Sequence, residues 1–146
     1  MDRPDLIVTT HNVRRLEDLL QSPELQDSPM AQLLEQELAS ARVVEDDRIP
    51  ADVVTMNSRV VCQDEDSGAR HELELVYPHE SDLERHRVSV LAPVGAALLG
   101  LAVGNTIAWP MPGGRTARVR VVSLPFQPEA AKLQANPTSM AARGTR

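Results

Sequence analysis

The feature that most limits the fold of this chain is a change of hydrophobic pattern at Pro50. Before this residue, apolar side chains recur mostly at spacings of three and four, which is typical of amphipathic helices. After it, β-branched residues alternate in places with polar ones, which is typical of strands. The chain has 146 residues, enough for one ordinary domain or for a small domain with an appendage. The pattern therefore predicts an α+β architecture in which a helical segment precedes a sheet.

The segment before Pro50 is predicted to form two helices joined by a breaker. Thr10 can cap the first helix, and Ser28 followed by Pro29 is a good start for the second. Residues 21–29 (QSPELQDSP) contain two prolines and several turn formers, so they end the first helix. Because the apolar stripes are narrow, we predict a short antiparallel helical hairpin, a coiled coil, over residues 1–49. The stripes consist of Val13, Leu16, Leu19 and Leu20, then Met30, Leu33, Leu34, Leu38 and Ala41.

Residues 50–128 are predicted to form a second domain, with about five antiparallel strands and one short helix. The expected strands cover residues 51–61, 71–77, 87–91, 105–110 and 116–124. Turns are expected at residues 64–68 (DEDSG) and 111–115 (MPGGR), and a short, mostly buried helix over residues 93–101. Residues 129–146 show no periodicity and are predicted to be a disordered tail.

Negative charge is concentrated in the helical segment. The chain has a net charge of −6; residues 1–49 carry −6, residues 50–128 carry −2, and residues 129–146 carry +2. Tight binding to nucleic acid needs clustered Lys and Arg, so we expect no strong nucleic-acid binding. The basic residues are fourteen arginines and one lysine. Arginine makes planar, bidentate contacts with carboxylates, so one interpretation is an acidic protein partner; the other is a genome that prefers arginine codons.

Residues that carry enzyme chemistry are few and scattered. Cys62 follows two valines at the end of an expected strand, so we expect a small buried hydrophobe and no nucleophile. None of the four histidines has a two-histidine helical metal spacing. The three aromatic residues, Tyr77, Trp109 and Phe126, are too few for an aromatic-lined pocket. We therefore expect no catalytic residue, metal, cofactor or small-molecule substrate.

Targeting and membrane signals are also missing from the sequence. No stretch reaches the about 18 apolar residues of a membrane span, and the first residues do not resemble a signal peptide. We expect no membrane association and a cytoplasmic location.

Glu24 and Asp27 are the acidic pair with the clearest chemical meaning. Two carboxylates three residues apart can converge at the end of the hairpin and hold a Mg²⁺ ion. The alternative is that acidic residues are common at solvated tips and at helix N-termini.

Four runs in the second domain carry a family resemblance. Residues 53–60 (VVTMNSRV) and 92–107 (APVGAALLGLAVGNTI) resemble the C-terminal domain of the Gre transcript-cleavage factors. Together with residues 75–78 (LVYP) and 112–114 (PGG), in this order, they are most similar to the Rnk-type regulators of nucleoside diphosphate kinase. The resemblance covers roughly residues 3–130.

This resemblance implies an FKBP-like fold for residues 50–128 and binding to bacterial RNA polymerase near its secondary channel. In the Gre factors the C-terminal domain docks outside, while a long coiled coil carries acidic residues to the catalytic Mg²⁺. Rnk-type proteins have a truncated coil and compete for the docking site without stimulating cleavage. The implied docking residues here are Ala92, Pro93, Val94, Gly95, Leu98 and Leu99. Leu98 and Leu99 are also expected in the core, and Ala92 stands where Gre factors often have serine.

The predicted lengths of the two helices test the resemblance. Helices of about ten and fifteen residues span roughly 15 and 23 Å, whereas a coil that crosses the channel needs about twice as much. The leading hypothesis is therefore a non-enzymatic regulator of transcription elongation that competes with Gre-type factors and affects nucleoside diphosphate kinase indirectly. Two alternatives stay open: a weak transcript-cleavage cofactor using Glu24 and Asp27, and a module that binds the kinase directly. Prolyl isomerase activity is not expected, because that pocket needs several aromatic residues.

Overall fold

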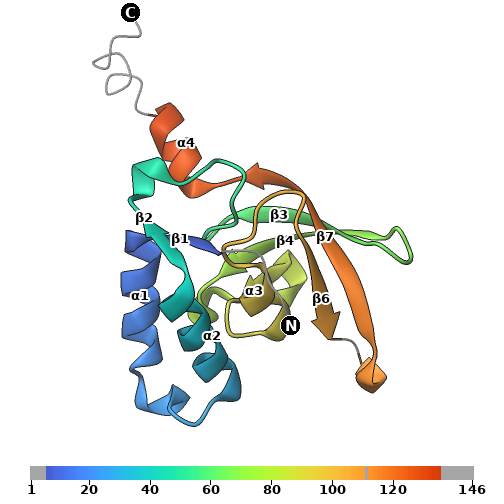
Figure 1. Ribbon diagram of the computed structural model, residues 1–146, viewed down its shortest axis with the longest axis horizontal. Helices are drawn as coiled ribbons and strands as arrows, with labels where there is room; N and C mark the ends of the chain where they lie inside the picture. The colour runs from blue at the N-terminus through green and yellow to red at the C-terminus, as the bar shows by residue number, and fades with distance from the viewer. Residues whose placement is uncertain (1–5, 111, 136–146) are drawn as a thin grey trace, which may run out of the picture.

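The computed structural model describes residues 6–110 and 112–135, and it places two helices beside a five-stranded sheet (Figure 1). Helix α1 (Thr10–Leu20) is followed by a short 3₁₀ turn, η1 (Pro23–Leu25), and by helix α2 (Pro29–Ser40). The second helix returns beside the first in the opposite direction (Figure 1). The α+β class predicted from the change of pattern is confirmed.

The helix starts follow the predicted capping signals, with one shift. The Thr9 hydroxyl, and not that of Thr10, accepts a hydrogen bond from the Asn12 amide at 3.1 Å. Thr10 is already helical, so the predicted cap was one residue late. Ser28 caps α2 as predicted, by accepting from the Ala31 amide at 3.2 Å, and Pro29 takes the first helical position.

Two short strands at the base of the helix pair were not predicted. Strand β1 (Ile7–Thr9) precedes α1, strand β2 (Arg42–Val44) follows α2, and the two strands pair in parallel. Because Ala41 is extended, with ψ at 155°, α2 has 12 residues where about fifteen were predicted. Runs of three residues are too short to show a strand pattern in the sequence.

The large sheet has the strand order β5-β4-β3-β7-β6. Its strands are β3 (Arg59–Asp64), β4 (Arg70–Val76), β5 (Arg87–Ser89), β6 (Thr106–Pro110) and β7 (Thr116–Phe126). A turn joins β3 to β4, and a short 3₁₀ turn, η5 (Pro112–Gly114), lies between β6 and β7, close to the predicted positions.

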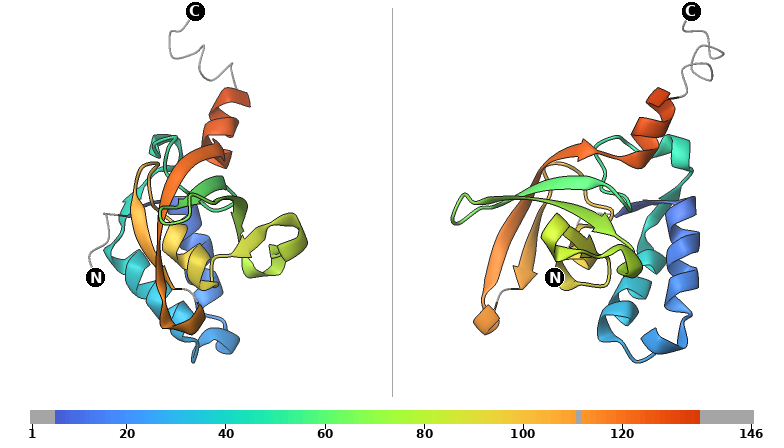
Figure 2. Two further views of the ribbon diagram at one scale, coloured as in Figure 1. Left: turned by 90° about the vertical axis from the view of Figure 1, so that its right-hand side faces the viewer. Right: turned by 180° about the vertical axis from the view of Figure 1, so that it is seen from behind.

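Two predictions for the sheet were wrong. Strand β5 pairs with β4 in parallel, because the chain crosses between them through η3 (Pro78–Glu80) and η4 (Leu83–Arg85). This crossover projects from the sheet in the left view of Figure 2. The first strand begins at Arg59 and not at residue 51. The residues before it form a loop in which Asn57 has a φ of 66°, which an extended strand cannot contain.

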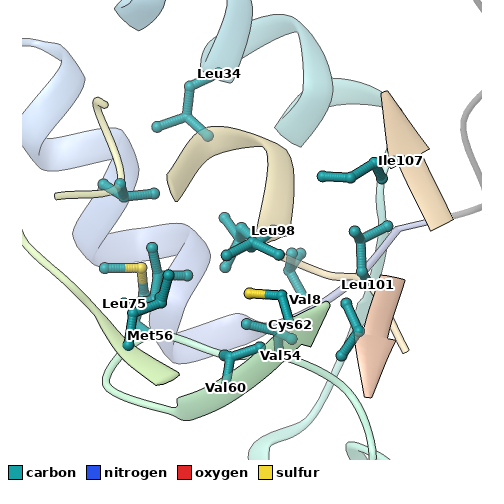
Figure 3. Packing of buried hydrophobic residues seen from close by; sticks show 14 of the residues in the cluster. Val8, Leu34, Val54, Met56, Val60, Cys62, Leu75, Leu98, Leu101 and Ile107 are labelled. Atoms are coloured by element: carbon teal, nitrogen blue, oxygen red, sulfur yellow. The ribbon is translucent and has the colours of Figure 1, made fainter. Parts of the chain in front are cut away.

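One buried cluster joins the sheet, the helix pair and helix α3 (Pro93–Leu98). Figure 3 shows Leu98, Cys62 and Val8 among its members, drawn from α3, β3 and β1. Cys62 is buried as predicted, and burial raises the pKa of its thiol to about 11, so the side chain stays neutral.

The chain after the sheet differs from the predicted tail. Helix α4 (Pro128–Ala135) forms where disorder was expected, and residues 136–146 of that predicted tail lie outside the described residues. The Gln127 side chain is buried and donates hydrogen bonds to the carbonyls of Pro50 and Val53, both at 2.8 Å. Its carbonyl oxygen accepts from the Ala130 amide and so caps α4. Within residues 6–110 and 112–135, no helix combines the length and the apolar character needed to cross a bilayer.

Candidate functional site

The segment that enters α3 is the first candidate site, because it holds the six implied docking residues. Ser89, at the end of β5, shapes it: its hydroxyl accepts from the Leu91 amide and its carbonyl from the Ala92 amide, both at 3.0 Å. Pro93 then takes the first helical position, where its missing amide costs nothing. Ala92 occupies the cap position without a side-chain hydrogen bond. The local fold therefore depends on Ser89 and Pro93, and it tolerates the loss of the cap serine.

Gly95 allows α3 to lie directly on the backbone of β5. A Cβ atom at this position would lie 2.1 Å from the Ser89 carbonyl oxygen, far inside van der Waals contact. At the other end of α3, the carbonyl of Gly100 accepts a hydrogen bond from the Ile7 amide. The Gly100 amide donates to the Val54 carbonyl. The glycine-rich motif thus fixes α3 between the sheet and the first strand.

The structure divides the six implied docking residues into two groups. Gly95, Leu98 and Leu99 are buried in the core and offer no surface to a partner. Pro93 is exposed, and Ala92 and Val94 are half-buried. Together with half-buried Leu91, they form an uncharged surface of residues 91–94, which we call the 91–94 surface. Such a surface can bind a partner protein by shape and apolar contact.

Glu24 and Asp27 lie at the far end of the helix pair, and both are exposed. Helices α1 and α2 have 11 and 12 residues, so each spans about 17 to 18 Å. Among the residues that the structure describes, no group of three or more His, Cys, Asp or Glu side chains is placed to hold a metal ion. The two carboxylates therefore lie at the end of a short arm, which is the helix pair α1 and α2.

A cavity of about 440 Å³ lies between α1 and α4, and it was not predicted from the sequence. The Arg15 guanidinium stacks over the Tyr77 ring, 4.1 Å from its centroid, in one wall. Burial raises the pKa of the Tyr77 hydroxyl, and the nearby Arg15 charge partly opposes this shift. Two of the runs that carry the family resemblance, residues 53–60 and 75–78, contribute residues to its lining. The described lining residues include His11, Asn12, Asp46, Asp47, Met56, Glu129 and Lys132.

Polar contacts around this cavity explain the VVTMNSRV run (residues 53–60). The Asn12 carboxamide oxygen accepts from the Met56 amide at 3.1 Å and so joins α1 to the loop. The Thr55 hydroxyl donates to the Glu129 carboxylate at 2.7 Å, which ties the loop to α4. The side-chain carboxamide nitrogen of Asn57 donates to the Glu80 carboxylate at 3.2 Å. The run is thus a structural joint, whose residues bond to α1, η3 and α4.

Two family descriptions match the chain over adjacent ranges. "Rnk N-terminus" matches residues 4–44, and "Transcription elongation factor, GreA/GreB, C-term" matches residues 49–125. The first range contains the helix pair with β1 and β2, and the second contains the five-stranded sheet and α3. Helix α4 lies outside both ranges.

Individual relatives agree with these matches. The "Regulator of nucleoside diphosphate kinase" of Escherichia coli is 42% identical over 131 residues, which cover 90% of this chain and 96% of the relative. GreA of Rhodospirillum rubrum is 32% identical over 122 residues, 78% of each chain. A solved structure, "Prokaryotic transcription elongation factor GreA/GreB from Nitrosomonas europaea", is 45% identical with a TM-score of 0.72. It is matched over 85% of this chain and 100% of that chain.

Proposed function

The chain belongs to the GreA/GreB family with an Rnk-type N-terminus, and on this premise we propose that it is a non-enzymatic regulator of transcription elongation that binds bacterial RNA polymerase near the secondary channel. Its curated relatives are named as a regulator or as elongation factors. The observation that carries the proposal is the shortness of the helix pair, 11 and 12 residues, on a Gre-type C-terminal domain.

The mechanism is occlusion of a shared docking site. The 91–94 surface contacts the polymerase at the rim of the channel, and its apolar character suits a protein contact. The helix pair then occupies the entrance, and its residues 1–49 bring a net charge of −6 with them. A longer Gre-type coil cannot enter while this arm is bound.

The shortness of the arm is also the argument against a transcript-cleavage role. Glu24 and Asp27 lie at the end of helices about 17 to 18 Å long, so they stop well short of a site inside the channel. The regulation of nucleoside diphosphate kinase, which the name of the Escherichia coli relative describes, is then an indirect, transcriptional effect. Binding of the purified protein to purified nucleoside diphosphate kinase would show instead that the regulation is direct.

Two finer features of the fold belong to the same proposal. We assign an FKBP-like topology to the sheet with α3, on the basis of the strand order β5-β4-β3-β7-β6 and its parallel β4–β5 crossover. We also treat α1 and α2 as a short coiled coil, since Leu16, Leu34 and Leu38 are buried along the pair. The FKBP-like domain serves as a docking platform and not as an isomerase.

A pull-down with core RNA polymerase tests the proposal directly. We expect retention at micromolar protein, and at least an about tenfold weaker affinity for Pro93→Glu, because a charge would be buried in an apolar contact. Leu83→Glu is the control, since Leu83 is 83% exposed on η4 and lies outside both the 91–94 surface and the helix pair. Absence of retention, or equal losses for both variants, would exclude the 91–94 surface as the contact. A cleavage assay on stalled complexes adds the second test, in which the chain should suppress Gre-stimulated cleavage.

A further inference from the structure

The outer face of the large sheet gathers arginines in an otherwise acidic chain. On this face Arg59 lies opposite Glu74, which lies opposite Arg87, and Gln63 lies opposite both Arg70 and Arg120. Helix α3 and the helix pair lie on the other side of the sheet in both views of Figure 2. Phe126 is the partner of Arg59 on β7 and is 41% exposed. We call this surface, which comprises Arg59, Arg70, Arg87, Arg118, Arg120 and Phe126, the arginine face.

The charge of the arginine face is opposite to that of the whole chain. Its five arginines have three acidic neighbours, Glu65, Glu72 and Glu74, which leaves a net charge of +2 where the chain as a whole carries −6. Arg87 pairs with Glu74 at 3.7 Å, and Arg120 with Glu65 at 3.5 Å. Arg59 and Arg118 are exposed and have no ion pair among the described residues. The face therefore holds positive charge that the protein itself does not neutralise.

A hollow of about 530 Å³ opens over one half of this face. The crossover between β4 and β5 forms its rim, and there Arg85 is already paired with Asp82 at 3.7 Å, so the unpaired positive charge comes from the strands. Its basic lining residues are Arg59, Arg70, His71, Arg85, His86 and Arg87. A partner segment seated here meets guanidinium groups from three neighbouring strands.

The chemistry of the face selects its partner. All five cations are arginines, whose planar guanidinium groups bind carboxylates in bidentate geometry. Phe126 supplies an apolar anchor, and aromatic residues with arginine are the side chains enriched in protein interfaces. Acidic residues interspersed on the face, and a single exposed ring, do not suit a continuous phosphate backbone or stacked bases. We propose that the arginine face binds an acidic segment of a partner protein, at a surface separate from the 91–94 surface.

A binding assay with a defined probe tests this proposal without the polymerase, so its failure is distinct from failure of the proposed function. The probe is a short fluorescein-labelled peptide of alternating Glu and Ala, measured by anisotropy at low salt. We expect Arg59→Gln with Arg70→Gln to weaken binding about fivefold, as for two exposed ion pairs. Arg14→Gln with Arg42→Gln removes the same charge from the exposed surface of the helix-pair region and should change binding less than about twofold.

Phe126→Ala distinguishes direct contact with the arginine face from long-range electrostatic attraction. It changes no charge, so a weaker affinity for the acidic peptide identifies contact with the face. Four results would overturn the proposal: no binding of the acidic peptide, equal binding of a peptide with Gln for Glu, equal losses for the two arginine pairs, or no effect of Phe126→Ala. Tighter binding of a labelled single-stranded DNA than of the acidic peptide would also overturn it, in favour of a nucleic-acid surface. Thermal melting of each variant by circular dichroism verifies that the exposed substitutions leave the fold intact.

Discussion

The entry to α3 and the tip of the helix pair are the two regions to which the family resemblance assigns function, and they are built in opposite ways. At α3 the backbone of the helix rests on β5, so close that Gly95 has no room for a Cβ atom. At the tip, Glu24 and Asp27 are exposed on a short turn between two helices. One region is fixed by packing on most sides, and the other is held only by the helices that lead to it.

This difference shows what the motifs of the sequence report. The glycine-rich run is recognisable because Gly95, Leu98 and Leu99 must fit a buried space. The residues with accessible surface, Ala92 to Val94, are few, and they carry no charged or polar side chain. A strong motif therefore identifies the fold, while the proposed partner contact involves the less constrained residues at its edge.

The largest expected effect is a loss of stability when the packing between α3 and β5 is disrupted. Gly95→Ala would place a Cβ atom 2.1 Å from the Ser89 carbonyl oxygen, so we expect the free energy of unfolding to fall by about 4 kcal/mol or more. Gly68→Ala is the matched control, because Gly68 lies in the β3–β4 turn with open space around it and a φ of 76°. Its cost should be about 1 to 2 kcal/mol, from backbone strain alone. Urea denaturation followed by circular dichroism measures the free energy of unfolding of both variants. Equal losses would show that α3 can move to accommodate the added Cβ atom.

The second-largest effect is expected in α2, and it tests whether the helix pair shares one core with the sheet. Leu34 is 1% exposed and its neighbour Leu33 is 44% exposed. We expect Leu34→Ala to lower the free energy of unfolding by about 3 kcal/mol, and Leu33→Ala by less than about 0.5 kcal/mol. Both should unfold in one transition, since Leu34 belongs to the cluster that contains Leu98 and Val60. Separate transitions for the helices and the sheet would mean that the pair folds as an independent unit.

The sequence predicted several elements correctly from local signals. Ser28 and Pro29 mark the start of α2, and the alternation after residue 116 marks β7. It did not predict β1 and β2, whose three residues each are specified by pairing between distant segments. The same holds for the Gln127 side chain, which bonds to Pro50 and Val53, and for the Arg15–Tyr77 stack. These contacts join residues far apart in the chain, so no periodicity or spacing reveals them.

The third prediction tests how well the core beneath α3 excludes water. The Cys62 thiol is fully buried, and burial raises its pKa from 9.0 to about 11. Between these values the folded chain keeps a proton that the unfolded chain releases, so stability falls as pH rises from about 9 to about 11. The loss assigned to this group is about 2 kcal/mol, and none of it is present at neutral pH.

The comparison that isolates this loss is between the parent chain and Cys62→Ala. The variant loses some packing at every pH, yet its free energy of unfolding should decline less steeply above about pH 9, because the titrating thiol is gone. Tyr77, whose pKa is also raised by burial, contributes the same slope to both proteins and cancels. Parallel curves for the two proteins would mean that water reaches Cys62 in the folded state.

The smallest effect is expected at the tip. Glu24→Ala with Asp27→Ala removes two exposed carboxylates from η1 and the residues after it, so the free energy of unfolding should change by less than about 0.5 kcal/mol. If the helix pair acts only by occupying the channel entrance, this double variant should also suppress Gre-stimulated cleavage as well as the parent chain does. Added to stalled complexes without a Gre factor, neither protein should shorten the transcript. Transcript shortening by the parent that disappears in the double variant would establish the cleavage alternative, and it would mean that a tip with almost no packing carries the chemistry. Unchanged competition would instead place the function in the length of the arm and the surface that anchors it, because the identity of the tip residues would then not matter.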